Sequence, residues 1–223
     1  MTITQQQPTI MLEGPAGHLE TLVVRPAITL HNSVPIVAVI GHPHPLHGGT
    51  MNNKVVTTLA RTLLELGIIA IRFNFRGVGA SEGQYDEGMG ETEDMLAVCR
   101  WAHQQFPQHR LWLAGFSFGS FVAYRTAHII PTEQLISIAP PVYRFPFENS
   151  MLPACQWLVV QGEQDEIVDP QAVFNWLAKL PVSPVVLRFT EAGHFFHGKL
   201  VLLRQQLQRE LKQLWPELHD VTA

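Results

Sequence analysis

The chain has 223 residues and a formal net charge of −4 at pH 7, with 46% hydrophobic and 15% charged residues. This length suits one large core and is short for two, so we expect a single domain over residues 1–223. The lysines and arginines are scattered, which argues against a nucleic-acid-binding surface, and no apolar run is long enough to span a membrane.

The N-terminal segment and the cysteines bear on the cellular compartment. Residues 1–8 are polar and uncharged, and they lack the basic start and apolar core of a signal peptide. Cys99 falls in a helical pattern and Cys155 in a strand pattern, so both are expected to be buried free thiols. These features favour a cytoplasmic protein.

Strand patterns alternate with helical patterns through most of the chain. The first two strands are expected to form an antiparallel hairpin, because residues 14–17 are a turn rich in Gly and Pro. The expected strands cover residues 9–13, 18–25, 35–40, 68–73, 110–114, 134–139, 153–162 and 185–190. The expected helices cover residues 55–64, 87–105, 120–127, 171–179 and 200–214. This alternation is typical of an α/β fold with a mainly parallel sheet of about eight strands and helices on both faces.

The segment Gly115-Phe116-Ser117-Phe118-Gly119 has the pattern of a nucleophile elbow. It lies between a short apolar strand and a helix, and its tight turn needs small residues two positions either side of the serine. Such a turn exposes the serine hydroxyl above the sheet and points the N-terminal amides of the next helix at the reacting centre. A chance Gly-x-Ser-x-Gly is the alternative, but this placement favours Ser117 as a nucleophile.

An acid and a histidine follow the serine in the order that this kind of site requires. Asp165 lies in the loop after the strand at 153–162, and His194 lies in the loop after the strand at 185–190. The other acids of the first loop are Glu163, Glu166 and Asp169. Asp169 precedes Pro170 and fits the N-cap of the next helix, which leaves Asp165 as the expected catalytic acid. His197 is the alternative to His194.

These features together resemble the α/β-hydrolase superfamily, and specifically its small lidless serine hydrolases. The resemblance covers nearly the whole chain and rests on residues 41–51, residues 72–83, the elbow, and the loops of Asp165 and His194. It implies a serine hydrolase with a Ser117–Asp165–His194 triad and with neither metal nor organic cofactor. His194 directly follows Gly193, as in the Gly-His of the family.

The segment His42-Pro43-His44-Pro45-Leu46-His47-Gly48-Gly49 holds three histidines that could form a metal site. It follows a strand where this fold builds an oxyanion hole, and no Asp or Cys nearby completes a ligand set. Proline has no N–H, so the oxyanion donor from this loop is the amide of His44 or of Leu46, and Phe118 supplies the other. The roles of the side chains of His42, His47 and His197 stay open.

Two further segments are interpreted through the same resemblance. The spacing of Gly77, Gly79 and Gly83 departs from the dinucleotide-binding fingerprint, so this loop is expected to be a structural turn. The cap of this fold usually follows the strand after the elbow helix, where residues 140–152 are too few for a helical lid. We therefore expect no cap domain and a site open to solvent.

The expected activity is hydrolysis of a carboxylic ester with a small acyl group, through an acyl-enzyme on Ser117. The residues expected to line the substrate are His42, Leu46, Phe116, Tyr143 and Phe195. The alternatives are an aminopeptidase or acyl-peptide hydrolase with the same triad, using Glu82, Glu87 or Glu148 to bind an amino terminus, and a non-catalytic binding protein. The expected partner is a small ester or amide, with no nucleic acid and no membrane, and nothing indicates an oligomeric state.

Overall fold

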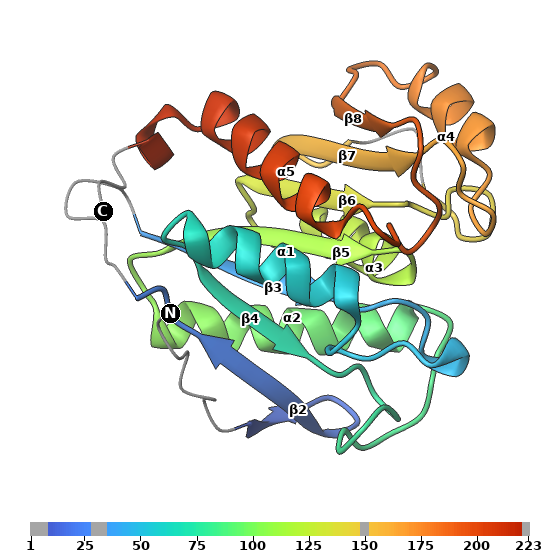
Figure 1. Ribbon diagram of the computed structural model, residues 1–223. Helices are drawn as coiled ribbons and strands as arrows, with labels where there is room; N and C mark the ends of the chain where they lie inside the picture. The colour runs from blue at the N-terminus through green and yellow to red at the C-terminus, as the bar shows by residue number, and fades with distance from the viewer. Residues whose placement is uncertain (1–8, 28–34, 148–151, 220–223) are drawn as a thin grey trace.

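The computed structural model describes residues 9–27, 35–147 and 152–219, which form one sheet of eight strands (Figure 1). The strands are β1 (Ile10–Gly14), β2 (Gly17–Val24), β3 (Ile36–Gly41), β4 (Ile69–Phe73), β5 (Arg110–Phe116), β6 (Gln134–Ile138), β7 (Gln156–Gly162) and β8 (Val185–Phe189). Their order in the sheet is β1-β2-β4-β3-β5-β6-β7-β8. β1 and β2 are antiparallel to their neighbours, and the other six strands are parallel. This confirms the predicted mainly parallel sheet that starts with a hairpin.

Helices cover both faces of the sheet, as predicted. They are α1 (Lys54–Glu65), α2 (Met89–Gln105), α3 (Phe118–Ala127), α4 (Pro170–Leu177) and α5 (Leu200–Leu214), with short 3-10 helices η1 (Pro45–His47) and η2 (Pro216–His219). The apolar faces of α1 and α5 pack on one side of the sheet, and those of α2, α3 and α4 pack on the other. Figure 1 shows α1 and α5 lying together in front of the strands.

Strand β3 shows why the centre of the sheet is apolar throughout. Its residues alternate between the two cores, with Val37 and Val39 on the α2–α3 side and Ile36, Ala38 and Ile40 on the α1–α5 side. All five are nearly or completely buried. The amino-acid sequence of a parallel strand that is covered on both faces is therefore a continuous apolar run. Each fully buried Val or Ile stabilises the fold by about 1.5–3 kcal/mol.

Helix α1 begins and ends at residues with clear local causes. Asn53 caps its start, because the Asn53 side-chain oxygen accepts a hydrogen bond of 2.9 Å from the amide of Val55. Gly67 follows its end with a φ of 79°, a conformation that glycine adopts at little cost. Between them, Leu59 and Leu63 are fully buried against the sheet.

Several boundaries differ from the predicted ones. Helix α3 begins at Phe118, directly after Ser117, and not at residue 120. Strand β7 begins at Gln156 and not at residue 153, since residues 153–155 precede the first pairing with β6. Cys99 is buried and free as expected, whereas the free thiol of Cys155 is only partly buried.

The connection between β6 and β7 carries no lid in its described parts. Residues 139–147 and 152–155 form turns and loop, and no helix is present among them.

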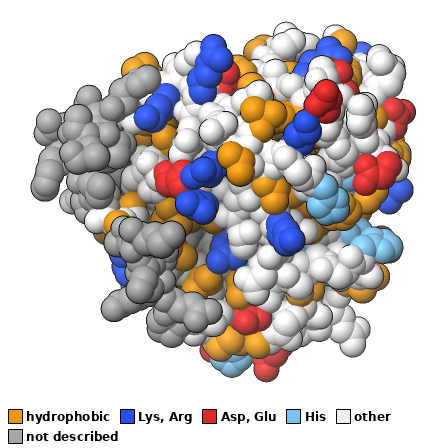
Figure 2. All heavy atoms as spheres, in the orientation of Figure 1, with side chains coloured by type: hydrophobic (Ala, Val, Ile, Leu, Met, Phe, Trp, Pro, Cys, Tyr) orange, Lys and Arg blue, Asp and Glu red, His pale blue; other side chains and the backbone are white. Residues whose placement is uncertain are grey.

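None of the helices in the described residues is long and apolar enough to cross a lipid bilayer. Figure 2 shows lysine, arginine and acidic side chains mixed over the face that carries α1 and α5, without a single basic patch.

Candidate active site

Ser117 occupies a strained turn between β5 and α3. Its φ of 53° and ψ of −120° lie outside the regions that a non-glycine residue usually adopts, which costs about 1–3 kcal/mol. Its amide donates to the carbonyl of Ile138 at 2.8 Å, and its carbonyl accepts from the amide and hydroxyl of Ser120 at 2.8 and 2.6 Å. These hydrogen bonds hold the backbone in a conformation that it would otherwise leave.

The glycines of the elbow are needed because backbone segments approach each other closely. A Cβ atom on Gly115 would collide with the backbone of Gly119. A Cβ atom on Gly119 would collide with the backbone of Gly41 at the end of β3. The pattern read from the sequence therefore has a steric cause that extends to the neighbouring strand.

The carboxylate of Asp165 accepts hydrogen bonds from four donors. Oδ2 lies 2.8 Å from Nδ1 of His194 and accepts from Nε2 of Gln161 at 3.2 Å. Oδ1 accepts from the amides of Ile167 and Val168 at 2.9 and 2.7 Å. Burial raises the pKa of Asp165, but the His194 interaction and the two amides outweigh burial, so the pKa lies below its usual value. Asp165 is thus held ionised against the imidazole.

The other acids of this loop have different partners. Glu163 pairs with Arg188 at 2.6 Å. Asp169 accepts from the amide of Gln171 at 2.9 Å and caps α4, as its position before Pro170 predicted. Glu166 accepts from the backbone amide of His194 at 3.1 Å, so it contacts the histidine's main chain and not its ring. Asp165 is the acid that contacts the ring.

The imidazole of His194 lies at the elbow. Its centroid is 4.9 Å from that of Phe116, the residue before Ser117, and 5.0 Å from that of Phe195. His194 and Asp165 are buried, and Ser117 is 9% exposed. His197 is exposed, and its ring lies against Phe195. All three predicted catalytic residues follow the carboxyl ends of strands, at one edge of the sheet.

His42 was expected among the residues that line the substrate, but its side chain is completely buried. Nε2 accepts a hydrogen bond of 3.0 Å from the amide of Phe75, so the proton of the neutral ring is on Nδ1, which donates to the carbonyl of Pro43 at 2.6 Å. Burial lowers the pKa of His42 to about 4. Both nitrogens are engaged, so His42 joins the loops after β3 and β4 and leaves no nitrogen for a metal or a substrate.

The other expected lining residues differ in exposure. Phe116 is completely buried beneath His194, which argues against contact with a substrate. Leu46 and Tyr143 are 68% and 50% exposed, and Phe195 is partly buried. Leu46, Tyr143 and Phe195 therefore stay as candidates for contact with an acyl group.

Two groups at the site carried little or no signal in the sequence. Gln161 is completely buried in β7 and donates to Asp165, and a polar residue inside an apolar strand was the available hint. Tyr85 contacts His44 through its hydroxyl, which lies 3.1 Å from Nε2 of that residue. The two residues are far apart in sequence, so no spacing rule connects them.

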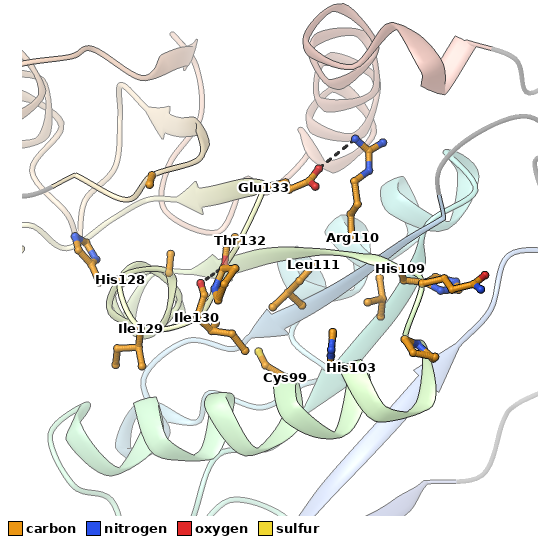
Figure 3. Close-up of a pocket in the computed structure, with 16 residues that line it drawn as sticks. Cys99, His103, His109, Arg110, Leu111, His128, Ile129, Ile130, Thr132 and Glu133 are labelled. Atoms are coloured by element: carbon orange, nitrogen blue, oxygen red, sulfur yellow. Dashed lines mark hydrogen bonds and ion pairs between the residues drawn. The ribbon is translucent and has the colours of Figure 1, made fainter.

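A separate cavity of about 830 Å³ opens at the opposite edge of the sheet. It lies between the last turns of α2 and α3 and the start of β5, and Figure 3 shows Cys99, His103, Leu111 and Ile130 around it. None of its described lining residues belongs to the group around Ser117. The large cavity and the candidate catalytic residues are therefore separate features.

Comparison with known proteins places this arrangement in a family. Residues 46–153 match the model of the alpha/beta hydrolase fold. The lidless a/b serine hydrolase XC6422 of Xanthomonas campestris is 46% identical, with a TM-score of 0.89 over 97% of this chain and 98% of that one. An alpha-beta serine hydrolase homologue of Coxiella burnetii is 45% identical, with a TM-score of 0.88 over 95% and 99% of the two chains. The uncharacterized protein RP471 of Rickettsia prowazekii is 36% identical over 203 residues, which are 86% of this chain and 83% of that protein.

These similarities show that the chain belongs to the α/β-hydrolase superfamily. Its solved relatives at this level of identity include serine hydrolases, one of them without a lid. Both the family and the fold therefore indicate that the protein is a hydrolase.

Proposed function

We propose that the protein is a carboxylic-ester hydrolase that acts through Ser117, Asp165 and His194. The main support is the buried contact of 2.8 Å between Asp165 and His194, at the same sheet edge as a serine held at positive φ. A serine hydroxyl is a weak nucleophile at neutral pH unless a base takes its proton. The backbone strain at Ser117 is the kind of feature that the fold retains at functional sites.

In the proposed first half-reaction, Ser117 Oγ attacks the carbonyl carbon of the ester while His194 Nε2 takes the hydroxyl proton. Asp165 holds the proton on Nδ1 and stabilises the imidazolium that forms. The tetrahedral intermediate then expels the alcohol, which receives the proton from Nε2. A water molecule repeats the sequence on the acyl-enzyme and releases the carboxylic acid and the free serine.

The negative oxygen of each tetrahedral intermediate needs backbone donors. The amide of Phe118 is the first candidate, because it opens α3 and has no acceptor within the helix. The loop at 42–49 is proposed to supply the second. Such donors aimed at the developing charge contribute about 3–4 kcal/mol each in related chemistry.

The proposed substrate is a small ester held in an open cleft beside Leu46, Tyr143 and Phe195. The exposure of Leu46 and Tyr143 supports this, since large apolar side chains near a catalytic edge provide contact area for an acyl group. The buried free thiol of Cys99 agrees with the reducing cytoplasm as the proposed compartment.

The amide-cleaving alternative has less support. Glu82 accepts from the backbone amide of His18 at 2.7 Å and pairs with the His18 ring at 3.0 Å, so it is already engaged. Glu148 lies outside the described residues. Glu87 is exposed, and the described residues show no hydrogen bond or ion pair that would hold its carboxylate toward Ser117.

Labelling with a fluorophosphonate and hydrolysis of p-nitrophenyl acetate test the proposal. Ser117→Ala is expected to abolish labelling and to lower kcat/KM by at least about 1,000-fold. Ser183→Ala, at an exposed serine, is the matched control and should behave as wild type. A chelator should leave the activity unchanged. Hydrolysis that survives Ser117→Ala, or that a chelator abolishes, would refute the proposal.

A further inference from the structure

We infer that the imidazole of His44 positions the oxyanion loop, by engaging the amide of Leu46 and leaving the amide of His44 itself as the second oxyanion donor. This inference rests on the proposed function. It assigns a role to a side chain whose function the sequence left open, in a residue expected to supply a backbone amide. It also decides between the two amides that the sequence left open.

The first argument concerns which backbone amides of the loop already donate to an acceptor. Pro43 and Pro45 have none. The amide of Leu46 donates to Nδ1 of His44 at 3.2 Å, and the amides of His47 and Gly49 both donate to the carbonyl of His44 at 3.1 Å. Within the described part of the chain, the amide of His44 has no acceptor. Of the two amides that the sequence left open, His44 and Leu46, that of His44 is therefore the one that an oxyanion can use.

The second argument is the tautomer of His44. A backbone amide only donates, so Nδ1 must carry a lone pair and the proton of the neutral ring is on Nε2. The hydroxyl oxygen of Tyr85 lies 3.1 Å from Nε2 and accepts that proton. Burial, followed by the nearby charges of His47 and Arg144, lowers the pKa of His44 and favours the neutral ring. The amide of Leu46 thus fixes the tautomer, and the hydroxyl of Tyr85 accepts the proton of Nε2 and helps to hold the ring in that orientation.

The third argument is that the ring contacts the other half of the proposed oxyanion hole. The centroid of His44 lies 5.1 Å from that of Phe118, whose amide is the first proposed donor, and 4.9 Å from that of Tyr85. Tyr85 and Phe118 also contact each other at 5.8 Å. One imidazole therefore links the loop after β3 to the first residue of α3. Its loss would loosen the geometry between the two donors without removing either.

The test compares His44→Asn with His44→Leu. The asparagine side-chain oxygen can accept from the amide two residues later, as in an Asx turn, whereas leucine cannot. His44→Leu is expected to lower kcat for p-nitrophenyl acetate by roughly 10- to 100-fold, less than removal of a whole oxyanion donor, with little change in KM. His44→Asn should recover most of that loss.

Tyr85→Phe is the second variant, and it keeps the ring contact with Phe118 while removing the hydroxyl. We expect a fall of a few-fold in its kcat. Equal kcat for His44→Asn and His44→Leu, or a wild-type kcat for Tyr85→Phe, would overturn the inference.

Thermal melting of each variant separates loss of positioning from loss of fold, and if His44→Leu does not fold, Tyr85→Phe decides. The proposed function fails separately, if wild-type protein shows no hydrolysis that depends on Ser117. An active wild type whose His44 variants do not differ overturns only the role of the imidazole.

Discussion

Replacing Asp165 by asparagine is the sharpest test of the proposed triad, because the structure predicts which way the new amide will point. The amides of Ile167 and Val168 both donate to Oδ1, at 2.9 and 2.7 Å. They will hold the carbonyl oxygen of asparagine at that position, which puts the NH₂ group where Oδ2 was. That group faces Nδ1 of His194, previously 2.8 Å from a carboxylate oxygen.

The expected consequence is a change of tautomer at His194. Nδ1 will accept from the new NH₂ group, so the ring proton moves to Nε2, the nitrogen that must take the proton of Ser117. The same change in a serine protease triad lowers kcat about 10⁴-fold, which corresponds to about 5 kcal/mol of transition-state stabilisation. One of the two N–H groups on Nε2 of Gln161 also loses its acceptor, which lay at 3.2 Å, while the other still donates to the carbonyl of Gly162 at 3.0 Å. That unsatisfied donor should lower the free energy of unfolding by about 1–3 kcal/mol.

The assay is kcat/KM for p-nitrophenyl acetate, together with urea unfolding of the same samples. Asp169→Asn is the matched control, because it makes the same chemical change in the same loop. Asparagine caps a helix about as well as aspartate, so the control should keep wild-type activity and stability. Asp165→Asn with more than about a tenth of wild-type kcat/KM would refute the role of Asp165, since loss of the tautomer should cost far more.

Two other predictions concern pH and substrate length. The folded pKa of His42 is about 4 against 6.5 for the free group, so the unfolded chain binds more protons between these values and stability falls as pH drops through that window. The pKa difference of 2.5 corresponds to about 3 kcal/mol of unfolding free energy. Urea unfolding at pH 7 and at pH 4 should therefore show a smaller loss of unfolding free energy in His42→Gln than in wild type. For p-nitrophenyl esters we expect a preference for short acyl groups of about two to six carbons, because each methylene left in water forgoes about 0.8 kcal/mol. Rates that rise steadily to long chains, or that jump when the substrate forms an interface, would contradict an open, lidless cleft.

The sequence predicted the parts of the fold that depend on local chemistry. The apolar runs and helical spacing gave the eight-stranded sheet and its helices, because burial on two faces leaves a clear pattern. The glycines at 115 and 119 marked the elbow because the turn excludes a Cβ atom there. The N-cap role of Asp169 was predictable since a proline follows it directly.

The sequence did not predict the contacts that join distant loops. His42 was placed in the cleft because it sits in a polar, histidine-rich loop, but its acceptor nitrogen bonds the amide of Phe75 in the loop after another strand. Gln161 and Tyr85 were missed for the same reason, since each acts on a residue that only the folded chain brings near. A side chain's residue type gives its chemistry, whereas its partner depends on the order of strands in the sheet.

The candidate site is built from loops that a few buried polar side chains hold together. His42 joins the loop after β3 to the one after β4, and Asp165 joins the loop after β7 to the one after β8. Asn74 accepts a hydrogen bond from the amide of Met51 at 2.8 Å and donates one to Glu20 at 2.7 Å. It thereby joins the loops after η1 and β4 to strand β2. The described part of the connection between β6 and β7 holds no lid that could order these loops, so such hydrogen bonds must supply the order themselves. Substitutions at His42 or Asn74 should therefore lower stability and catalytic rate together, although neither side chain reaches the reacting atoms in the proposed mechanism.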